Sequence, residues 1–375
     1  MATHLKVIIS GGGTGGHIFP AISIANALKE KDPDTEILFV GAEGRMEMQK
    51  VPAAGYEIVG LPIMGLDRKR WWRNFKVLYK LFVSKRRVKK TIREFAPHVA
   101  VGVGGYASAP TLQVAASMGI PTVLQEQNSY AGLTNKMLSK HAHAICVAYD
   151  EMDRFFPKEK LVLTGNPIRQ ELLTQTKNQE EALQTYNWTG NKKTVLILGG
   201  SLGARTINEA VKAHLSTMAN SSVQFIWQTG KLYIEDAKRA LEEIGNPQNI
   251  YASDFVTDMA TAYKAADLVI SRAGASSISE IALLGKASIL VPSPNVAEDH
   301  QTKNAQALVK KQAALMITDA QAVSQLIPTA LTTVEDQSTL RKLSEQVRLL
   351  AHPDAANVIA QKIIDIALQH QKNNL

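Results

Sequence analysis

A glycine-rich turn near the start of the chain has the composition of an anion-binding site. Residues 10–17 read Ser-Gly-Gly-Gly-Thr-Gly-Gly-His, between the apolar run Leu5–Ile9 and the amphipathic stretch Ile18–Leu28. The short β-branched run predicts a buried parallel strand, and the helical spacing after it predicts a helix. The turn would therefore join a strand's carboxyl end to a helix's amino end, where unpaired N–H groups and the helix dipole favour a phosphate.

The spacing of this turn matches two other glycine-rich motifs only in part. Gly11-x-Gly13-x-x-Gly16 matches the dinucleotide-binding fingerprint, but the acidic residue expected at the end of the next strand is displaced to Glu43. A P-loop is excluded, because His17 stands where the P-loop needs lysine and no Ser or Thr follows it. An ordinary strand-to-helix turn remains open, although such a turn needs neither two glycine clusters nor a histidine.

A second turn of this kind lies in the second half of the chain. Residues 271–280 read Ser-Arg-Ala-Gly-Ala-Ser-Ser-Ile-Ser-Glu, which again is a strand end, a glycine and a helix start. The small Ala275 and Ser276 leave helix-terminal N–H groups accessible to a phosphate, and Ser201, in a parallel glycine turn, offers a hydroxyl. These residues predict a second site for a phosphate group.

Polar side chains beside these turns suit a nucleotide sugar. Glu280 could accept hydrogen bonds from both hydroxyls of a ribose, although Ser277 and Glu280 could instead form a capping box. Residues 299–301, Asp-His-Gln, follow another strand end and suit sugar hydroxyls. No metal and no cofactor is expected: the nine histidines are scattered, and the sole Asp-x-Asp, at 32–34, lies in a loop entering a strand. Helix termini rather than magnesium would then stabilise a leaving diphosphate.

The elements that must position these residues alternate between strand-like and helix-like segments. Such alternation predicts a parallel sheet with helices on both faces. The pattern pauses in the polar segment Gln175–Lys193 and restarts at Thr194. The expected strands are Leu5–Ile9, Glu36–Val40, Tyr56–Val59, Val99–Val103, Thr122–Leu124, Ala144–Val147, Leu161–Leu163, Thr194–Leu198, Val223–Trp227, Asn249–Tyr251, Leu268–Ser271, Ala287–Val291 and Leu315–Ile317.

We therefore expect an α/β protein of two doubly wound, Rossmann-like domains that face each other across a cleft. The first would span residues 1–165, the second 166–350, and residues 351–375 would form a helix packing back towards the first. The turns Gly104–Tyr106 and Gln125–Asn128 would open on the same carboxyl edge as the first glycine turn.

The composition is that of an ordinary soluble globular protein, with 45% hydrophobic and 20% charged residues over 375 positions. The single Cys146 lies in an apolar run, so we expect a buried thiol and no intramolecular disulfide. Neither a signal peptide nor a membrane span is expected, because no window reaches roughly eighteen uninterrupted apolar residues.

The basic charge of the chain is concentrated in one stretch. Residues 66–93 hold twelve Lys or Arg against Asp67, an excess of +11, so the net charge of +8 leaves −3 for the rest. Cations mixed with aromatic rings suit an anionic membrane surface, and nucleic acid is less favoured because no nucleic-acid-binding fold accompanies the patch. Val77, Leu81, Val88 and Ile92 could meanwhile face the protein's own sheet. The expected membrane residues are Arg68, Lys69, Arg70, Trp71, Trp72, Arg73 and Phe75.

Short motifs run in a recognisable order over nearly the whole chain. They are Gly12–His17, Gly104–Tyr106, Gln125–Asn128, Gly165–Arg169, Gly199–Ser201 and Arg272–Ala275. Together they resemble the MurG family of peptidoglycan N-acetylglucosaminyltransferases. The resemblance implies a GT-B fold and a peripheral protein on the cytoplasmic side of the cell membrane. It also implies inverting transfer of N-acetylglucosamine from UDP-N-acetylglucosamine (UDP-GlcNAc) to the C4 hydroxyl of undecaprenyl-pyrophosphoryl-MurNAc-pentapeptide (lipid I), giving lipid II.

Inversion requires one direct displacement, and hence a general base but no covalent intermediate. His17 is the predicted base because its pKa suits neutral pH; Glu126 is the alternative, and a His17 that only holds the turn also remains open. By resemblance, Val256 would meet the uracil through its backbone and Glu280 the ribose. The predicted substrate-binding residues are Thr14, Gly15, Gly16, Asn128, Arg169, Ser201, Val256, Ala275, Ser276, Glu280 and Gln301.

The chain departs from the family pattern at a few positions. Leu202 replaces the usual glutamine, Gln125 replaces the commoner histidine, and His300 stands where a second glutamine is frequent. The first departure puts a side-chain contact to the donor in doubt. Alternative functions are a GT-B transferase for another membrane lipid such as diacylglycerol, a noncatalytic nucleotide-sugar-binding membrane tether, and a Rossmann oxidoreductase that would bind NAD(H) in the first half.

Overall fold

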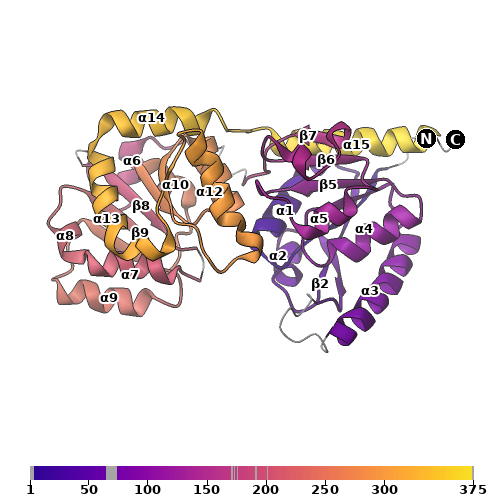
Figure 1. The fold of residues 1–375 in the computed structure, drawn as a ribbon, viewed down its shortest axis with the longest axis horizontal. Helices are drawn as coiled ribbons and strands as arrows, with labels where there is room; N and C mark the ends of the chain where they lie inside the picture. Colours follow the sequence, from indigo (N-terminus) through magenta and orange to yellow (C-terminus); the bar gives the residue numbers. More distant parts are fainter. Residues whose placement is uncertain are drawn as a thin grey trace. The chain divides into compact units, whose positions relative to one another are not determined.

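The computed structural model describes residues 4–64, 74–169, 172, 174, 176–190, 192–200 and 202–373. The chain forms two compact units. Unit 1 comprises Met1–Arg169 and His352–Leu375, and unit 2 comprises Gln170–Ala351. Each unit is a parallel sheet with helices on both faces, so the chain consists of two Rossmann-like domains (Figure 1).

The sheet of unit 1 has its topological switch point between β1 and β4. All its strand pairs are parallel, in the order β3-β2-β1-β4-β5-β6-β7. The carboxyl ends of β1 and β4 meet where the strand order reverses, which is the usual ligand position in such sheets. The strands are β1 (Lys6–Ser10), β2 (Glu36–Ala42), β3 (Glu57–Leu61), β4 (Val99–Gly102), β5 (Thr122–Glu126), β6 (Ala144–Val147) and β7 (Leu161–Leu163).

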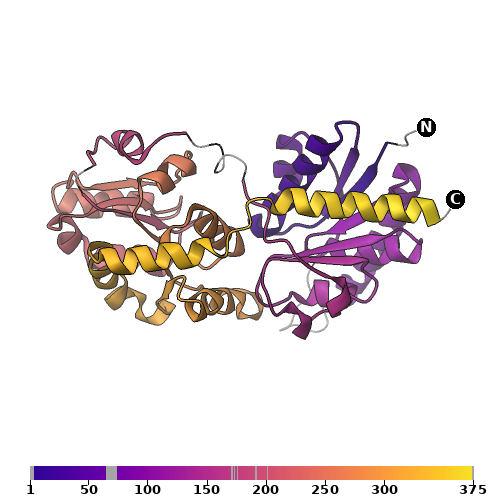
Figure 2. The ribbon, with the colours of Figure 1, turned by 90° about the horizontal axis from the view of Figure 1, so that it is seen from above.

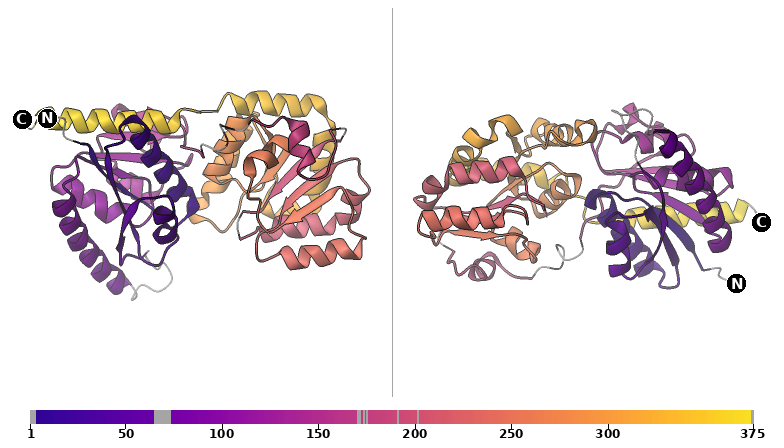
Figure 3. Two further views of the ribbon diagram at one scale, coloured as in Figure 1. Left: turned by 180° about the vertical axis from the view of Figure 1, so that it is seen from behind. Right: turned by 90° about the horizontal axis from the view of Figure 1, so that it is seen from below.

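Helices cover both faces of this sheet because its central strands are apolar on both sides. Val7 and Ile9 of β1 pack in the cluster with α1 and α15, whereas Ile8 points to the face of α3 and α4. The C-terminal helix α15 lies along α1 within unit 1 (Figures 2 and 3). The helices are α1 (Gly15–Lys31), α2 (Glu47–Ala53), α3 (Asn74–Phe95), α4 (Ser108–Ser117), α5 (Leu133–Leu138) and α15 (Ala355–Asn373), with short 3₁₀ turns η2 (Met152–Arg154) and η3 (Lys158–Lys160).

Unit 2 repeats the arrangement with its switch point between β8 and β11. Its strand order is β10-β9-β8-β11-β12-β13, again all parallel. The strands are β8 (Thr194–Leu198), β9 (Gln224–Gln228), β10 (Ile250–Ser253), β11 (Leu268–Ser271), β12 (Ala287–Leu290) and β13 (Leu315–Met316). The helices are α6 (Gln179–Gln184), α7 (Arg205–Ala213), α8 (Leu215–Ala219), α9 (Ile234–Glu243), α10 (Met259–Ala265), α11 (Ala275–Leu284), α12 (His300–Lys310), α13 (Asp319–Glu335) and α14 (Gln337–Arg348), with the 3₁₀ turn η5 (Ala297–Asp299).

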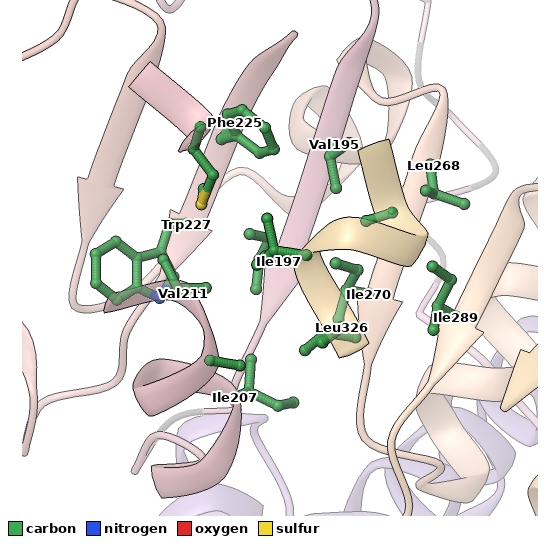
Figure 4. Packing of buried hydrophobic residues seen from close by; sticks show 14 of the residues in the cluster. Val195, Ile197, Ile207, Val211, Phe225, Trp227, Leu268, Ile270, Ile289 and Leu326 are labelled. Carbon is green, nitrogen blue, oxygen red and sulfur yellow. The ribbon is translucent and has the colours of Figure 1, made fainter. Parts of the chain in front are cut away.

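The core of unit 2 is built around Trp227 on β9. Its ring packs beside Ile197 and Val211 (Figure 4). Its indole N–H donates to Asn208 Oδ1 at 2.9 Å, and Asn208 Nδ2 donates to the carbonyl of Thr229 at 2.8 Å. A buried amide thereby ties α7 to the turn that follows β9.

Every expected strand is present, but two helix predictions were wrong. The first helix begins at Gly15 rather than Ile18, so the glycines and His17 form its first turn. The polar segment 175–193 contains α6, which a capping box starts: Asn178 and Glu181 each bind the other's backbone N–H, at 2.9 and 2.8 Å. The Asn-x-x-Glu spacing is a sequence signal for such a box.

The apolar pattern also predicts which side chains are buried, and the structure bears this out for Cys146 and for most of the named residues of α3. Cys146 is fully buried, and burial raises the pKa of its thiol to about 12. On α3, Val77, Val88 and Ile92 are buried, whereas Leu81 is only half-buried. Among the described helices, none is long and apolar enough to cross a bilayer.

Candidate active site

The glycine turns that follow β1 and β4 pack against each other through bare backbone. A Cβ at Gly105 (φ +86°) would lie 2.3 Å from the carbonyl oxygen of Gly12, and a Cβ at Gly11 would lie 2.1 Å from Val103 Cγ2. Real Cβ atoms do not approach other atoms so closely. These glycines therefore permit the two turns at the switch point to form one surface.

His17 is held by its Nδ1 atom on this surface. Nδ1 lies 3.1 Å from the carbonyl oxygen of Gly12 and 3.2 Å from Thr14 Oγ1. A carbonyl oxygen only accepts hydrogen bonds, so the contact with Gly12 favours the tautomer protonated at Nδ1. Nε2 then carries the lone pair. That atom faces Gly104, where a Cβ would approach it to 2.9 Å.

The first turn of α1 presents backbone donors next to His17. The N–H of His17 donates to the carbonyl of Thr14 at 3.1 Å, and the N–H of Gly13 donates to Glu47 Oε2 at 3.0 Å. Within the described part of the chain, the N–H groups of Thr14, Gly15 and Gly16 donate to no protein acceptor. Such N–H groups at a helix N-terminus suit an anion, which is what the sequence predicts for this turn.

Glu126, at the end of β5, is buried, and its carboxylate accepts hydrogen bonds from other residues of the protein. Its carboxylate accepts the N–H of Asn128 at 3.1 Å, the N–H of Gly132 at 3.0 Å and Asn135 Nδ2 at 2.9 Å. Burial raises the pKa of this carboxyl, and the hydrogen bonds oppose that rise. This arrangement folds the loop after β5 around the carboxylate and holds Asn128, a predicted substrate-binding residue, in place.

A buried amide network joins the neighbouring loops of unit 1. Gln125 Nε2 donates to Asn166 Oδ1 at 2.9 Å, and Asn166 Nδ2 donates to the carbonyl of Gln127 at 3.0 Å. Beyond it, Ser23 on α1 donates to the carbonyl of Ile168 at 3.2 Å. These bonds fix the segment that leads to Arg169.

In unit 2, α11 begins directly after the turn that follows β11. Gly274 is its N-cap residue, so Ser277 lies inside the helix and the alternative of a Ser277–Glu280 capping box was wrong. The N–H groups of Ala275 and Ser276 donate to no protein acceptor among the described residues. Ser276 Oγ is buried and likewise has no hydrogen-bond partner there. A buried hydroxyl costs free energy unless a ligand or water binds it.

The other predicted donor-binding residues of unit 2 have defined backbone or side-chain partners. Glu280 is buried and accepts the phenol O–H of Tyr263 at 3.1 Å. The N–H of Val256 donates to Gln228 Oε1 at 3.0 Å. The carbonyl of Val256 is therefore the backbone group that could accept a hydrogen bond from a nucleobase such as uracil. Gln301 Oε1 accepts the N–H of Ser293 at 2.8 Å, which directs its amide N–H groups away from that bond.

Some predicted residues lie outside the described part of the chain. They are Ser201 and, in the basic stretch, Arg68, Lys69, Arg70, Trp71, Trp72 and Arg73. Phe75 is described only by its backbone, in the first turn of α3.

Sequence reasoning missed the side chains that support these sites from behind. Glu47, Gln228 and Tyr263 are all buried, and each binds a residue of a predicted site. Glu47 lies 34 positions from the glycine it binds. The only local signal for Glu47 is a Glu between apolar neighbours in an amphipathic segment. This signal does not indicate which residue the carboxylate binds.

Within the described residues, no group of His, Cys, Asp and Glu side chains is arranged to hold a metal ion. Instead, the switch point of unit 1 has a histidine in the first turn of a helix. The switch point of unit 2 has a hydroxyl and a carboxylate near the start of another helix. Two Rossmann-like domains in one chain are the arrangement of the GT-B fold, to which many glycosyltransferases belong.

Comparisons with known proteins narrow this class. The N-terminal domain model of glycosyltransferase family 28 matches residues 7–147, and its C-terminal domain model matches residues 194–359. The chain is 59% identical to a UDP-N-acetylglucosamine–N-acetylmuramyl-(pentapeptide) pyrophosphoryl-undecaprenol N-acetylglucosamine transferase of Phocaeicola vulgatus, over 100% of both chains. A transferase of the same name from Cytophaga hutchinsonii is 51% identical over 96% of each chain.

A comparison with solved structures supports the same family. The crystal structure of Acinetobacter baumannii MurG matches 96% of this chain and 99% of its own, with a TM-score of 0.78 and 27% identity. The calicheamicin glycosyltransferase CalG4 has a TM-score of 0.70 at 13% identity, which shows the fold alone. The chain therefore belongs to glycosyltransferase family 28 and, within it, to the MurG transferases.

Proposed function

We infer that this protein transfers N-acetylglucosamine from UDP-GlcNAc to lipid I, giving lipid II for peptidoglycan synthesis. Full-length identity of 59% to transferases of that name is the observation that carries the inference. UDP release should be measured with lipid I and with diacylglycerol as separate acceptors. Release with lipid I alone is expected; release with diacylglycerol alone would support a transferase for another membrane lipid, and no release with either would support a nucleotide-sugar tether.

UDP-GlcNAc binds to unit 2 in this proposal. The diphosphate accepts from the N–H groups of Ala275 and Ser276 and from the buried Ser276 hydroxyl, which the described chain leaves without a partner. Glu280 binds the ribose hydroxyls, and the carbonyl of Val256 accepts from the uracil. Gln301 and Ser201 complete the contacts to the sugar and the diphosphate.

His17 is the general base of the displacement. Nε2 takes the proton of the acceptor's C4 hydroxyl, whose oxygen attacks C1 of N-acetylglucosamine while the bond from C1 to the UDP oxygen breaks. The anomeric centre inverts, and UDP leaves with the bonding electrons. The contact from Nδ1 to the carbonyl of Gly12 supports this role, because it leaves the lone pair on Nε2.

Other residues of unit 1 hold the reacting groups. The N–H groups of Thr14, Gly15 and Gly16 bind an anionic or polar group of the substrates, and Asn128 and Arg169 contribute further polar contacts. Glu126 positions Asn128 rather than taking a proton, since both its carboxylate oxygens already accept internal hydrogen bonds.

We further propose that the protein is peripheral on the cytoplasmic side of the cell membrane and docks through the basic stretch and α3. Leu78, Tyr79 and Phe82 on α3 are 54% to 68% exposed, and the guanidinium of Arg86 lies 4.4 Å from the Phe82 ring centroid. Apolar and aromatic side chains among cations suit an anionic lipid surface, and no nucleic acid is required.

Vesicle binding tests this docking. Changing Arg68, Lys69, Arg70 and Arg73 to Ser should weaken binding to anionic vesicles by about 4 kcal/mol at most, roughly 1 per cation, and by less at high salt. Changing Leu78, Tyr79 and Phe82 to Ser should weaken binding to anionic vesicles at any salt concentration.

Leu349→Ser is the matched control, because Leu349 is 76% exposed in unit 2. Activity on a short-chain, water-soluble acceptor should survive in all variants. If vesicle binding is unchanged while activity on the water-soluble acceptor is lost, the basic stretch belongs to the core or the active site.

A further inference from the structure

Glu47 is a buried carboxylate directly behind the first glycine turn. It is the first residue of α2 and is only 1% exposed. Its Oε2 atom accepts the N–H of Gly13 at 3.0 Å, and its Oε1 atom accepts the N–H of Ala42, at the end of β2, at 3.0 Å. One side chain therefore ties the turn after β1 to the end of the neighbouring strand.

The backbone around Glu47 is shaped to contain this carboxylate. A Cβ at Gly12 (φ +149°) would lie 2.2 Å from Glu47 Oε1, and a Cβ at Gly41 would lie 2.6 Å from its Cγ. Any side chain at either position would displace the carboxylate. These two glycines thus make room for a side chain of the protein, not only for a ligand.

No cation pairs with Glu47 among the described residues. Burying a carboxylate without a counter-ion is costly, and here the two backbone N–H groups compensate for the lost water. A packing role alone would be served at lower cost by an uncharged side chain. The carboxylate supplies what an uncharged side chain of this shape does not, namely two acceptors at once.

We propose that Glu47 is a positioning residue for His17 and for the anion-binding end of α1. By taking the N–H of Gly13, it fixes the peptide between Gly12 and Gly13 with the Gly12 carbonyl directed at His17 Nδ1. The ligand is left with the next donors along the chain, the N–H groups of Thr14, Gly15 and Gly16. The proposal deepens the role of His17 proposed above and rests on it for the effect on catalysis.

Glu47→Gln separates hydrogen bonding from packing. The amide has nearly the same shape, but only its oxygen accepts, so one of the two N–H groups would face an NH₂ donor. Asp267→Asn is the matched control: Asp267 Oδ2 accepts the N–H of Thr194 at 2.9 Å at the start of β8 in unit 2, and Oδ1 pairs with Lys193. It replaces one of two accepting carboxylate oxygens by an NH₂ group at the amino ends of β8 and β11, the edge opposite the glycine turn that follows β11.

The experiment measures kcat, the KM for each substrate, Tm, and the ¹⁵N NMR signals of the histidine rings. His17→Gln assigns the His17 signals. We expect Glu47→Gln to lower kcat at least tenfold and to move the His17 ring away from a pure Nδ1–H tautomer. Asp267→Asn should lower Tm while leaving kcat and the His17 signals unchanged.

Distinct outcomes would overturn the proposal. If Glu47→Gln lowers Tm but leaves kcat and the His17 tautomer as in the wild type, Glu47 is structural only. Should that variant not fold, Glu47→Asp, whose shorter chain reaches one N–H at most, gives the same readouts. If His17→Gln itself keeps full activity, the assigned base is wrong, yet the tautomer shift still tests Glu47 separately.

Discussion

The turns that follow β1 and β11, at the two switch points, have a similar backbone arrangement but differ in where their ionisable side chains lie. In unit 1, the helix after β1 carries the ionisable His17 in its first turn and has the Glu47 carboxylate behind that turn. In unit 2, the helix after β11 begins with Ala275 and Ser276, and its carboxylate, Glu280, lies one turn further in. In the described part of the chain, the first N–H groups of both helices donate to no protein acceptor, an arrangement that suits an anion.

The difference assigns separate tasks to the two turns. A histidine at the first turn of a helix can move a proton beside a bound substrate, whereas small residues with a hydroxyl can only hold a charged group. In addition, the Glu47 carboxylate holds the turn after β1 through the N–H of Gly13. The comparison thus predicts that unit 1 variants change kcat and unit 2 variants change donor affinity.

The largest effect is expected at His17, the proposed general base. His17→Gln should lower kcat by about 10²- to 10⁴-fold, the usual contribution of a general base, with the KM for UDP-GlcNAc little changed. Steady-state kinetics with lipid I measures both values. A rise in the donor KM with an unchanged kcat would mean that the first turn only binds, and the contrast between the turns would disappear.

The next effect concerns the carboxylate of the other turn. Glu280→Ala would remove the proposed hydrogen bonds between this carboxylate and the ribose. Hydrogen bonds to a charged group are worth about 1.5–3 kcal/mol, or roughly 10- to 150-fold in donor affinity. Calorimetric titration with UDP and the KM for UDP-GlcNAc should both change by this factor, while the KM for lipid I stays constant. Equal losses for donor and acceptor would contradict the assignment of Glu280 to the ribose.

A smaller effect is expected from the tyrosine that holds this carboxylate. Tyr263→Phe removes one buried hydrogen bond to Glu280, worth about 1 kcal/mol, so the donor KM should rise roughly fivefold. The matched comparison is Tyr263→Phe in the Glu280→Ala background, where the hydroxyl has no carboxylate to position. If the tyrosine substitution raises the donor KM equally in both backgrounds, Tyr263 acts on packing and not through Glu280.

The strands and the helix start after Arg272 could be predicted from the sequence, but the buried side chains that bind residues of the predicted sites could not. Alternating apolar runs and glycine turns are local patterns, so the strands before Gly11 and Arg272 and the N-terminus of α11 could be predicted. The hydrogen bond from Gly13 to Glu47 depends on how α2 packs against β2, β3 and α1. No local pattern encodes that contact, and the same holds for Tyr263 and Glu280, which lie on different helices.

The start of α1 shows a further limit of local patterns. Glycines disfavour a helix interior, so the sequence placed Gly15 and Gly16 in a loop. In the structure they form the first turn, where the carbonyl of Thr14 accepts the N–H groups of His17 and Ile18, at 3.1 and 3.2 Å. The packing of Gly12 against Gly105 fixes this turn from outside, which propensity does not report.

The smallest effect is expected from removing divalent metal. This experiment tests whether backbone N–H groups, which both turns offer, suffice to neutralise phosphate charge. Both would neutralise phosphate charge with backbone N–H groups, and among the described residues no acidic or histidine cluster is arranged for a metal. Glu47 does not serve as a ligand, because both its oxygens accept backbone N–H groups. Initial rates with lipid I should therefore agree within error in excess EDTA and in added magnesium. Activity lost in EDTA and restored by magnesium would mean that a metal, rather than the helix termini, carries the diphosphate charge, and the shared plan of the two turns would then not explain catalysis.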